Sequence, residues 1–416
     1  MRNPGRTSGT APEACAAAWA ASGVVELSGC ADGPPLLPPG RAAPAAGEMA
    51  ARFAAATGAP ALNGARLLSE RAAFTGHRRR GRVSPGGACR LLPAADGWAA
   101  VSCARPDDPA LLGALAGADA GDDPWPAVEG WLHAHTGAEL AERAELLGVA
   151  AGPVRVSPGG ARVPAPASLR PVKDALVVDF SALWAGPLCA HLLGLAGARV
   201  VKVETPSRPD GARHGDPGFY RLLHAGHRSV VLDPATTAGR RAMAALVEAA
   251  DIVIEASRPR ALARFGLDAE AAAAAGTTWV SITANGRASG RVGFGDDVAA
   301  GAGLVCRDAD LRPLFCGDAI ADPLTGLTAA VLAAAAPPGG GMLWDVSMSD
   351  VVAATLDPHP PAESVPALAH GDGWAIETEH GIEPVQAPVR REPAGDAPAM
   401  GADTSDVLRE LGIAIP

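Results

Sequence analysis

The feature that most constrains this fold is the regular alternation of strand-length apolar runs with helix-like segments between residues 175 and 283. ALVVDF (175–180) is a continuous, mostly apolar run of strand length. The following segment, GPLCAHLLGLAG (186–197), carries Pro187 in its first turn and closes on a glycine, as helices do. The next run, 199–203, is strand-like again. This order predicts a βαβ unit.

The alternation continues along the chain. Further strand-like segments are 228–232, 251–255 and 279–283, and further helix-like segments are 237–250 and 260–265. Strands that alternate with helices form parallel sheets covered on both faces. The sequence therefore predicts an α/β fold with a doubly wound, mostly parallel, Rossmann-like sheet.

Sheets of this kind bind ligands beyond the carboxyl ends of their strands. In this chain those ends lead into the loops 181–185, 205–216 and 256–259, where we expect the site. The first strand-to-helix turn reads FSALWAGPL and lacks the GxGxxG pattern that lets a backbone approach a pyrophosphate. The sequence therefore argues against a nicotinamide enzyme.

The length of 416 residues exceeds the size at which one hydrophobic core stops growing, which favours two packed units. The clearest boundary is the proline- and glycine-rich stretch 152–171, which reads as a linker. Before it, 139–147 is typical of an amphipathic helix and 97–103 of a strand, so we expect a smaller α+β domain at 1–151. After it we expect the large domain at 172–356 and a C-terminal segment at 357–416.

Charge and cysteine usage exclude several classes of function. A formal charge of −10 argues against nucleic acid as the main partner, although the window 199–264 holds eleven Lys and Arg against seven Asp and Glu. That window suits an anionic small ligand or a solvated helix face. No apolar run reaches the roughly 18 residues of a membrane span. Seven cysteines without a CxxC pair argue against disulfides and zinc, so we expect a cytoplasmic protein without a metal or a membrane partner.

A weak internal repeat is also visible. ASGVVELSGCADGPPLLPPG (21–40) is echoed by GAGLVCRDADLRPLFCG (301–317), and an alanine-rich, helix-like stretch follows each copy. The shared order indicates duplication or rearrangement.

Seven signatures occur in an order that resembles the family III CoA-transferases, the group that includes formyl-CoA transferase, carnitine CoA-transferase and α-methylacyl-CoA racemase. They are VVDFSALWAGPLCAHLLGLAGARVVKVE (177–204), HRSVVLD (227–233), ADIVIEASRP (250–259), RFGL (264–267), SITANG (281–286), GDAIADPLTGL (317–327) and WDVSMSD (344–350), the last of them strand-like. The resemblance implies coenzyme A, as an acyl-CoA, and a carboxylic acid as the substrates.

The resemblance also implies a catalytic carboxylate. The family places its catalytic Asp in a D-x-x-x-G context at the start of a helix, and Asp322 followed by Gly326 matches that context. A carboxylate can attack a thioester to give a mixed anhydride, which the released thiolate attacks in turn. Pro323 suits a helix start, where the helix dipole would help to keep Asp322 charged. On its residues alone, Asp322 is more simply explained as a helix N-cap.

The positions that match family contacts to CoA follow the same alignment. They are Trp184, Ala185, Leu232, Asp233, Ala256, Ser257, Arg258, Arg264, Asp296 and Asp297. Arg258 and Arg264 carry the strongest physical argument, because guanidinium groups hold phosphates bidentately. Where many members have Lys-Arg-Ser and Gly-Tyr-Asp, this chain has 227–229 as His-Arg-Ser and 295–297 as Gly-Asp-Asp. The racemases place a His at the position of Asp296, so racemisation is disfavoured.

The order of the domains departs from the family. Residues 78–108 and 146–154 are similar to the family's small domain, which would then be relocated to the N-terminus, ahead of the large domain, with 357–416 returning to that domain. Gly86 and Gly87 would stand in for the mobile glycine loop of the family, and Ala43 would occupy the position of Asp322 in the first repeat. The resemblance further implies a homodimer.

The leading hypothesis is a CoA-transferase that moves CoA from an acyl-CoA to a carboxylic acid through an anhydride at Asp322. The alternatives are an α-methylacyl-CoA racemase or epimerase and a non-catalytic acyl-CoA-binding protein.

Overall fold

Six parallel strands form the central sheet of the computed structural model, which describes residues 12–119, 121, 123–156, 161, 163–256, 259–358, 362–378 and 381–416. The strands are β4 (Leu176–Asp179), β5 (Arg199–Glu204), β6 (Arg228–Val231), β7 (Ile252–Glu255), β8 (Thr278–Thr283) and β11 (Met342–Ser347). Their order across the sheet is β11-β8-β7-β4-β5-β6. From β4 the chain adds β5 and β6 on one side and then β7, β8 and β11 on the other side. The point where the strand order reverses therefore lies between β4 and β7. This arrangement confirms the predicted doubly wound α/β fold.

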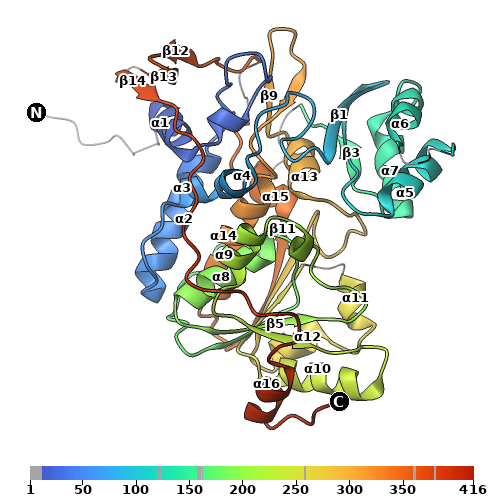
Figure 1. Cartoon of the computed structure of the whole chain (residues 1–416), viewed down its shortest axis with the longest axis vertical. Helices are drawn as coiled ribbons and strands as arrows, with labels where there is room; N and C mark the ends of the chain where they lie inside the picture. Colours follow the sequence, from blue (N-terminus) through green and yellow to red (C-terminus); the bar gives the residue numbers. More distant parts are fainter. Residues whose placement is uncertain are drawn as a thin grey trace, which may run out of the picture.

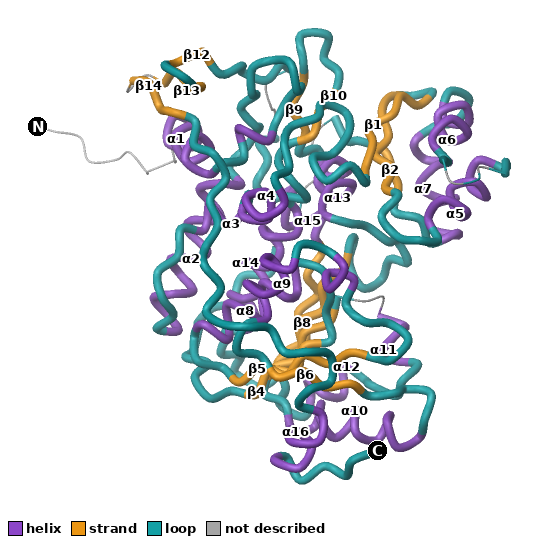
Figure 2. Tube along the Cα trace, viewed as in Figure 1, coloured by secondary structure: helices purple, strands orange, loops and turns teal. Residues whose placement is uncertain are grey.

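Helices cover both faces of the sheet, as Figures 1 and 2 show. Alternate side chains of a strand point to opposite faces, so Val177 and Val178 of β4 enter two different cores. One core includes residues of α8 (Ala185–Leu195) and α14 (Ala321–Ala333). The other includes residues of α10 (Thr237–Ala249), α12 (Ala269–Ala274) and α16 (Thr404–Glu410). Burial on both faces explains why the strands read as nearly continuous apolar runs.

The segment 344–350, which reads as strand-like, divides between two elements. Its first half completes β11, and from Met348 the chain turns into the short helix α15 (Met348–Ala353). Ser347 is the N-cap of this helix, and its hydroxyl accepts a hydrogen bond from the backbone N–H of Asp350 at 3.2 Å.

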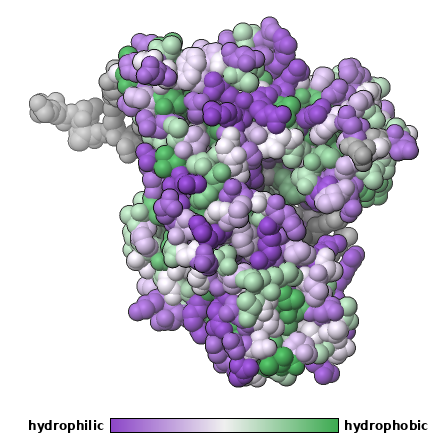
Figure 3. Space-filling view, viewed as in Figure 1, coloured by the Kyte–Doolittle hydropathy of each residue, from purple (hydrophilic) through white to green (hydrophobic). Residues whose placement is uncertain are grey.

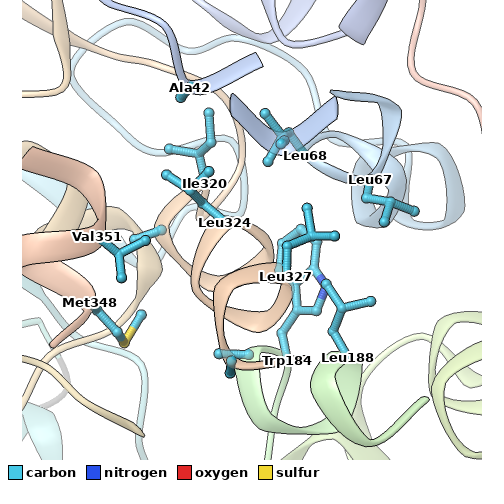
Figure 4. Close-up of a cluster of buried hydrophobic side chains, with 14 of the residues drawn as sticks. Ala42, Leu67, Leu68, Trp184, Leu188, Ile320, Leu324, Leu327, Met348 and Val351 are labelled. Atoms are coloured by element: carbon cyan, nitrogen blue, oxygen red, sulfur yellow. The ribbon is translucent and has the colours of Figure 1, made fainter. Parts of the chain in front are cut away.

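The N-terminal helices belong to the same core as α8 and α14. These helices are α1 (Pro12–Ser22), α2 (Ala42–Thr57), α3 (Gly64–Leu67) and α4 (Glu70–Thr75), with the 3₁₀ turn η1 (Val25–Leu27) after the first. Figure 4 shows Ala42 and Leu68 beside Ile320 at the start of α14. The alanine-rich faces allow these helices to approach α14 closely. The segment expected as one small domain, 1–151, is therefore divided between two cores.

Residues 89–153 form a smaller α+β unit with a core of its own. Three antiparallel strands, β1 (Cys89–Ala94), β2 (Gly97–Ser102) and β3 (Ala151–Pro153), pack against α5 (Asp108–Ala116), α6 (Trp125–Leu132) and α7 (Gly137–Leu147). Leu112, Val128 and Leu140 are completely buried between the strands and these helices. The second, smaller α+β part of the predicted fold class is thus confirmed.

The remaining elements connect these units. They are η2 (Gly211–His214), α9 (Pro217–His224), α11 (Pro259–Ala263), α13 (Gly295–Ala302), the hairpin β9 (Val305–Arg307) and β10 (Pro313–Phe315), and the small sheet β12 (Leu368–His370), β13 (Gly373–Thr378) and β14 (Gly381–Pro384). From β14 the chain runs back along the molecule to α16 (Figure 1). There Asp403 accepts hydrogen bonds from the Arg228 side chain at 3.0 Å and the Ser229 backbone at 2.8 Å.

Two pairs of matching sequence positions also occupy equivalent places in the structure. Ala43 is the second residue of α2 and Asp322 the second residue of α14. The tetrapeptide Asp-Gly-Trp-Ala also occurs twice, at 96–99 and at 372–375. Both copies turn a hairpin in the same register, with Ala94 opposite Gly97 in one and His370 opposite Gly373 in the other.

None of the helices in the described ranges is both long and apolar enough to span a membrane. The face drawn in Figure 3 mixes hydrophilic and hydrophobic residues.

Candidate active site

Four aspartates meet where α13 and α14 begin. Asp296 and Asp297 lie in the first turn of α13, Asp318 precedes α14, and Asp322 is in the first turn of α14. The first three are buried, and Asp322 is partly exposed. The charges of the other three act on Asp322 and raise its pKa, which places all four carboxyl groups in one cluster. We call these four residues the aspartate cluster.

Asp322 does not cap its helix. The N-cap position of α14 is Ile320, which makes no side-chain capping hydrogen bond, and Asp322 is already the second helical residue. Its carboxylate forms no hydrogen bond with any described residue, whereas its backbone N–H donates to the carbonyl of Ala319 at 2.9 Å. The N-cap explanation is therefore wrong, and the carboxylate is left free.

Burial dominates the electrostatics of Asp322. Removal of the carboxylate from water raises its pKa to about 7, the guanidinium of Arg71 opposes this change, and the other three aspartates reinforce it. The helix start was expected to keep this group charged. That contribution is smaller than the cost of burying a charge beside three other carboxyl groups.

Glycines bring the backbone close around Asp322. A Cβ on Gly326 would lie 2.7 Å from the carbonyl oxygen of Ala185, so glycine at this position lets α14 pack closely on α8. A Cβ on Gly295 would overlap an oxygen of Asp322. The glycine of the D-x-x-x-G context therefore has a packing role one helical turn after the aspartate.

Asp318 forms an ion pair with Arg71 of α4. Arg71 Nε donates to Asp318 Oδ2 at 2.8 Å, and Arg71 Nη2 donates to Oδ1 at 2.5 Å. His77 Nδ1 lies 3.2 Å from the same Oδ1. Burial alone would raise the pKa of Asp318, but the Arg71 guanidinium outweighs it and holds that pKa well below its usual range. Asp318 is therefore the member of the cluster that stays ionised.

Asp297 and Asp296 are held by hydrogen bonds at the start of α13. Asp297 Oδ1 accepts from the Ser102 hydroxyl at 2.8 Å and from the Phe294 N–H at 2.9 Å. Asp296 Oδ1 accepts from the Ala319 N–H at 2.8 Å. Burial raises the pKa of Asp297 to about 7 and that of Asp296 to about 6. Because Ser102 ends β2, the small α+β unit reaches the cluster directly.

Two residues at the site have unfavourable backbone angles. Ala319, between Asp318 and Asp322, has a φ of 46°, and Leu183, which precedes Trp184, has a φ of 70°. Side chains other than glycine rarely adopt these values, and such strain concentrates at functional sites. At Leu183 the strain is compensated by a hydrogen bond from its N–H to Asp210 Oδ1 at 3.0 Å.

The predicted CoA positions divide into two groups. Trp184 and Ala185 follow β4 but are buried, and the Trp184 ring packs 5.0 Å from the Arg71 guanidinium and edge-on to Phe219. Asp296 and Asp297, also expected to contact CoA, lie in the aspartate cluster, where their short side chains are buried.

The other predicted positions follow the carboxyl ends of β6 and β7. Leu232 is buried in the core that α10, α12 and α16 share, whereas Asp233 and Ala256 are exposed. The exposed side chain of Arg264 has no partner among the described residues. Ser257 and Arg258 lie outside the described residues.

The predicted glycine loop lies against the ion pair. A Cβ on Gly86 would lie 3.7 Å from both Arg71 Nη2 and Asp318 Oδ1. Gly87, next to it, has a φ of 82°. The loop between Ser84 and Cys89 thus passes over Arg71, close to the aspartate cluster.

Sequence reasoning missed several residues of this site: Arg71, His77, Ser102 and Asp318. Asp318 lies in the quoted segment 317–327, and a second acid four residues before Asp322 was a usable signal. Arg71 gave none, because an arginine in a short helix resembles any solvated surface residue.

Residues 172–384 match the family model described as CoA-transferase family III. The chain is 30% identical over 211 residues to succinate–glutarate CoA-transferase from Agrobacterium fabrum, covering 45% of this chain and 53% of that protein. It is 27% identical over 267 residues to succinyl-CoA–D-citramalate CoA-transferase from Chloroflexus aurantiacus, covering 59% of this chain and 65% of the relative. The chain thus spans about half to two thirds of the length of these two relatives.

Among solved structures, a CAIB/BAIF family protein from Brucella suis aligns with a TM-score of 0.44 at 26% identity, covering 52% of this chain and 65% of that chain. A hypothetical protein from Mycobacterium tuberculosis aligns with a TM-score of 0.41 at 28% identity, covering 46% of this chain and 58% of that one.

Proposed function

Because the chain belongs to CoA-transferase family III, we propose that it transfers CoA from an acyl-CoA thioester to a carboxylic acid through an anhydride on Asp322. The observation that carries the proposal is the free carboxylate of Asp322. The residue is partly exposed, and its carboxylate has no hydrogen-bond donor among the described residues. A carboxylate in this state is available to attack an electrophile.

The chemistry of the transfer balances without a further reagent. An oxygen of ionised Asp322 attacks the thioester carbonyl, the C–S bond breaks, and CoA leaves as a thiolate while Asp322 carries the acyl group as a mixed anhydride. The thiolate then attacks the Asp322 carbonyl, which releases the first acid and leaves an aspartyl–CoA thioester. The acceptor carboxylate reverses both steps, so that a new acyl-CoA forms and Asp322 is regenerated.

The surroundings of Asp322 support this chemistry. An anhydride survives only where water is kept away, and the carboxylate of Asp322 lies in a largely buried cluster beside the loop of Gly86. We propose that this loop covers the reacting carbonyl. The strand-end loops would hold CoA, with the unpaired Arg264 on its phosphates and with Asp233 and Ala256 along its path.

The names of the relatives direct the choice of substrates for a test. Succinyl-CoA would be incubated with isotopically labelled glutarate, and other donor–acceptor pairs would follow, with mass spectrometry of the CoA thioesters as the readout. The proposal expects label in a new thioester with the wild type and none with Asp322→Asn. Asp350→Asn is a matched control, because Asp350 is an exposed acid in the first turn of the neighbouring helix α15.

The same samples test the alternatives. Incorporation of solvent deuterium at the carbon next to the thioester, without formation of a new thioester, would indicate a racemase and not a transferase. Tight CoA binding without either reaction would indicate a non-catalytic acyl-CoA-binding protein.

The homodimer and the cytoplasmic location are parts of the same proposal. All seven cysteines are free thiols, which supports a reducing compartment. A solution mass near that of one chain, measured by light scattering, would contradict the dimer.

A further inference from the structure

We propose that Arg71 binds the carboxylate of the acid substrate and places it beside Asp322. The inference rests on the proposed transferase function and adds to it the group that recognises the acid. It assigns this role to a residue of α4, far in sequence from the sheet that carries the predicted CoA loops.

Arg71 is held rigidly, which a positioning role requires. Two of its nitrogens donate to the two oxygens of Asp318, as described above. The preceding residue, Glu70, is buried and accepts from Arg391 of the C-terminal segment at 2.7 and 2.8 Å. Arg391 in turn lies 3.1 Å from the ring nitrogen Nε2 of His191 on α8. The short helix α4 is therefore anchored through neighbouring residues to two other parts of the fold.

One edge of the Arg71 guanidinium remains free. Asp318 uses Nε and one N–H of Nη2, whereas Nη1 has no partner among the described residues. The side chain is 25% exposed, while that of Asp318 is fully buried. Nη1 together with the second N–H of Nη2 forms the planar fork that binds a carboxylate bidentately. The ion pair with Asp318 therefore leaves this edge unpaired and already oriented for a carboxylate.

The charge of the site requires such a group. An acid substrate enters as an anion, and the aspartate cluster would repel it. Arg71 is the cation that lowers the pKa of Asp322 against the contributions of burial and of Asp296, Asp297 and Asp318. Asp318 offsets part of the positive charge of Arg71, and His77 Nδ1 contacts the same Asp318 Oδ1 that Arg71 Nη2 binds. The free edge of Arg71 is where the local charge favours a carboxylate.

The position also fits the chemistry. An acid bound to Arg71 lies next to the carboxyl group whose thioester it must attack. The negative charge that develops on the carbonyl oxygen during that attack would be near the same guanidinium. The Trp184 ring, 5.0 Å away, supports one face of the guanidinium and limits its movement.

The test separates acid recognition from folding. Removal of Arg71 alone would leave Asp318 buried and unpaired, so the variant is the double substitution Arg71→Met with Asp318→Asn. The donor–acceptor pair that is fastest in the wild type serves as the assay. We expect the KM for the acid to rise about tenfold or more, in keeping with the loss of a charge-assisted hydrogen bond, and the KM for the acyl-CoA to change less than about twofold.

Two further variants make the outcome specific. Arg71→Lys keeps a cation and should recover part of the affinity for the acid. Arg66→Met removes an exposed arginine of the neighbouring helix α3 and should change neither KM. Equal increases in both KM values, or a double variant with an unchanged KM for the acid, would overturn the role of Arg71.

The failure of the proposed function would look different. In that case the wild type itself would transfer CoA to none of the acids, and the inference would fall with it. If the wild type is active and the double variant uses the acid as well as the wild type does, only the inference about Arg71 is wrong.

Discussion

Arg71 and Asp318 form a two-point ion pair although they are 247 residues apart in the chain. The pair joins an N-terminal helix to the turn that leads into α14. Ser102 makes a second connection of this kind, to Asp297. The N-terminal half therefore completes the aspartate cluster within one chain.

The first prediction concerns the pH dependence of activity. Asp322 must be ionised to attack, and burial raises its pKa to about 7. We expect kcat/KM for the acyl-CoA to rise with pH through about 7 and to fall about tenfold per pH unit below it. In Asp297→Asn the rise of kcat/KM should occur at lower pH, because the Asp297 charge raises the pKa of Asp322. A profile that stays flat down to pH 5 would contradict the assignment.

The second prediction concerns stability. The pKa of Asp297 in the folded protein, about 7, is above its ordinary value of 3.8, so between these values the folded state binds the extra proton. The stabilisation is complete below the lower value and is lost as the pH rises through about 7. The free energy of unfolding should therefore fall between pH 5 and pH 8 in the wild type. In Asp297→Asn this fall should be smaller by on the order of 2 kcal/mol.

Denaturant unfolding at several pH values measures this difference. Asp318 contributes no slope in that window, because its depressed pKa keeps it ionised throughout. Parallel curves for the variant and the wild type would refute the buried, protonated state of Asp297.

The third prediction compares two glycines at matching places in the repeat. Gly326 lies four residues after Asp322, and Gly47 lies four residues after Ala43. Gly326→Ala should cost about 1–3 kcal/mol, because its Cβ would press on the Ala185 carbonyl. Gly47→Ala has open space and should gain about 0.5–1 kcal/mol from helix propensity. Thermal unfolding of the two variants would show shifts of opposite sign, and shifts of the same sign would disprove the packing argument.

The fourth prediction concerns CoA binding. Arg264→Ala should weaken CoA binding about tenfold, because an unpaired guanidinium near the carboxyl ends of the strands would lose its phosphate contact. Arg199 is the matched control, since it is also exposed but begins β5 at the opposite end of the sheet. Titration calorimetry with free CoA measures both variants. Equal affinities for Arg264→Ala and Arg199→Ala would remove Arg264 from the site.

Local sequence patterns were sufficient for the sheet domain. Strands buried on both faces, such as β4 and β7, read as apolar runs, and Pro187 marked the first turn of α8. The division of 1–151 between two cores was not predictable in this way. It depends on which helix packs against the alanine-rich faces of α1 and α2. An alanine-rich pattern does not indicate which partner a helix face will contact.

The site was predictable only where one segment carries it. Asp322 and its glycine four residues later lie on one helix, so their spacing is visible in the sequence. The partners of the cluster come from α4, β2 and α13, and only the fold brings them together. Burial was not predictable either: the side chains of Asp296 and Asp297, predicted to lie along CoA, are enclosed beside Asp322.

Trapping with hydroxylamine would show whether Asp322 carries the acyl group. The wild type, Asp322→Asn and Asp350→Asn would be incubated with acyl-CoA donors and hydroxylamine, digested, and examined by mass spectrometry. We expect a hydroxamate on the peptide that contains Asp322, in the wild type and in Asp350→Asn but not in Asp322→Asn. A hydroxamate on a different residue, or none with any donor despite measurable CoA binding, would contradict it.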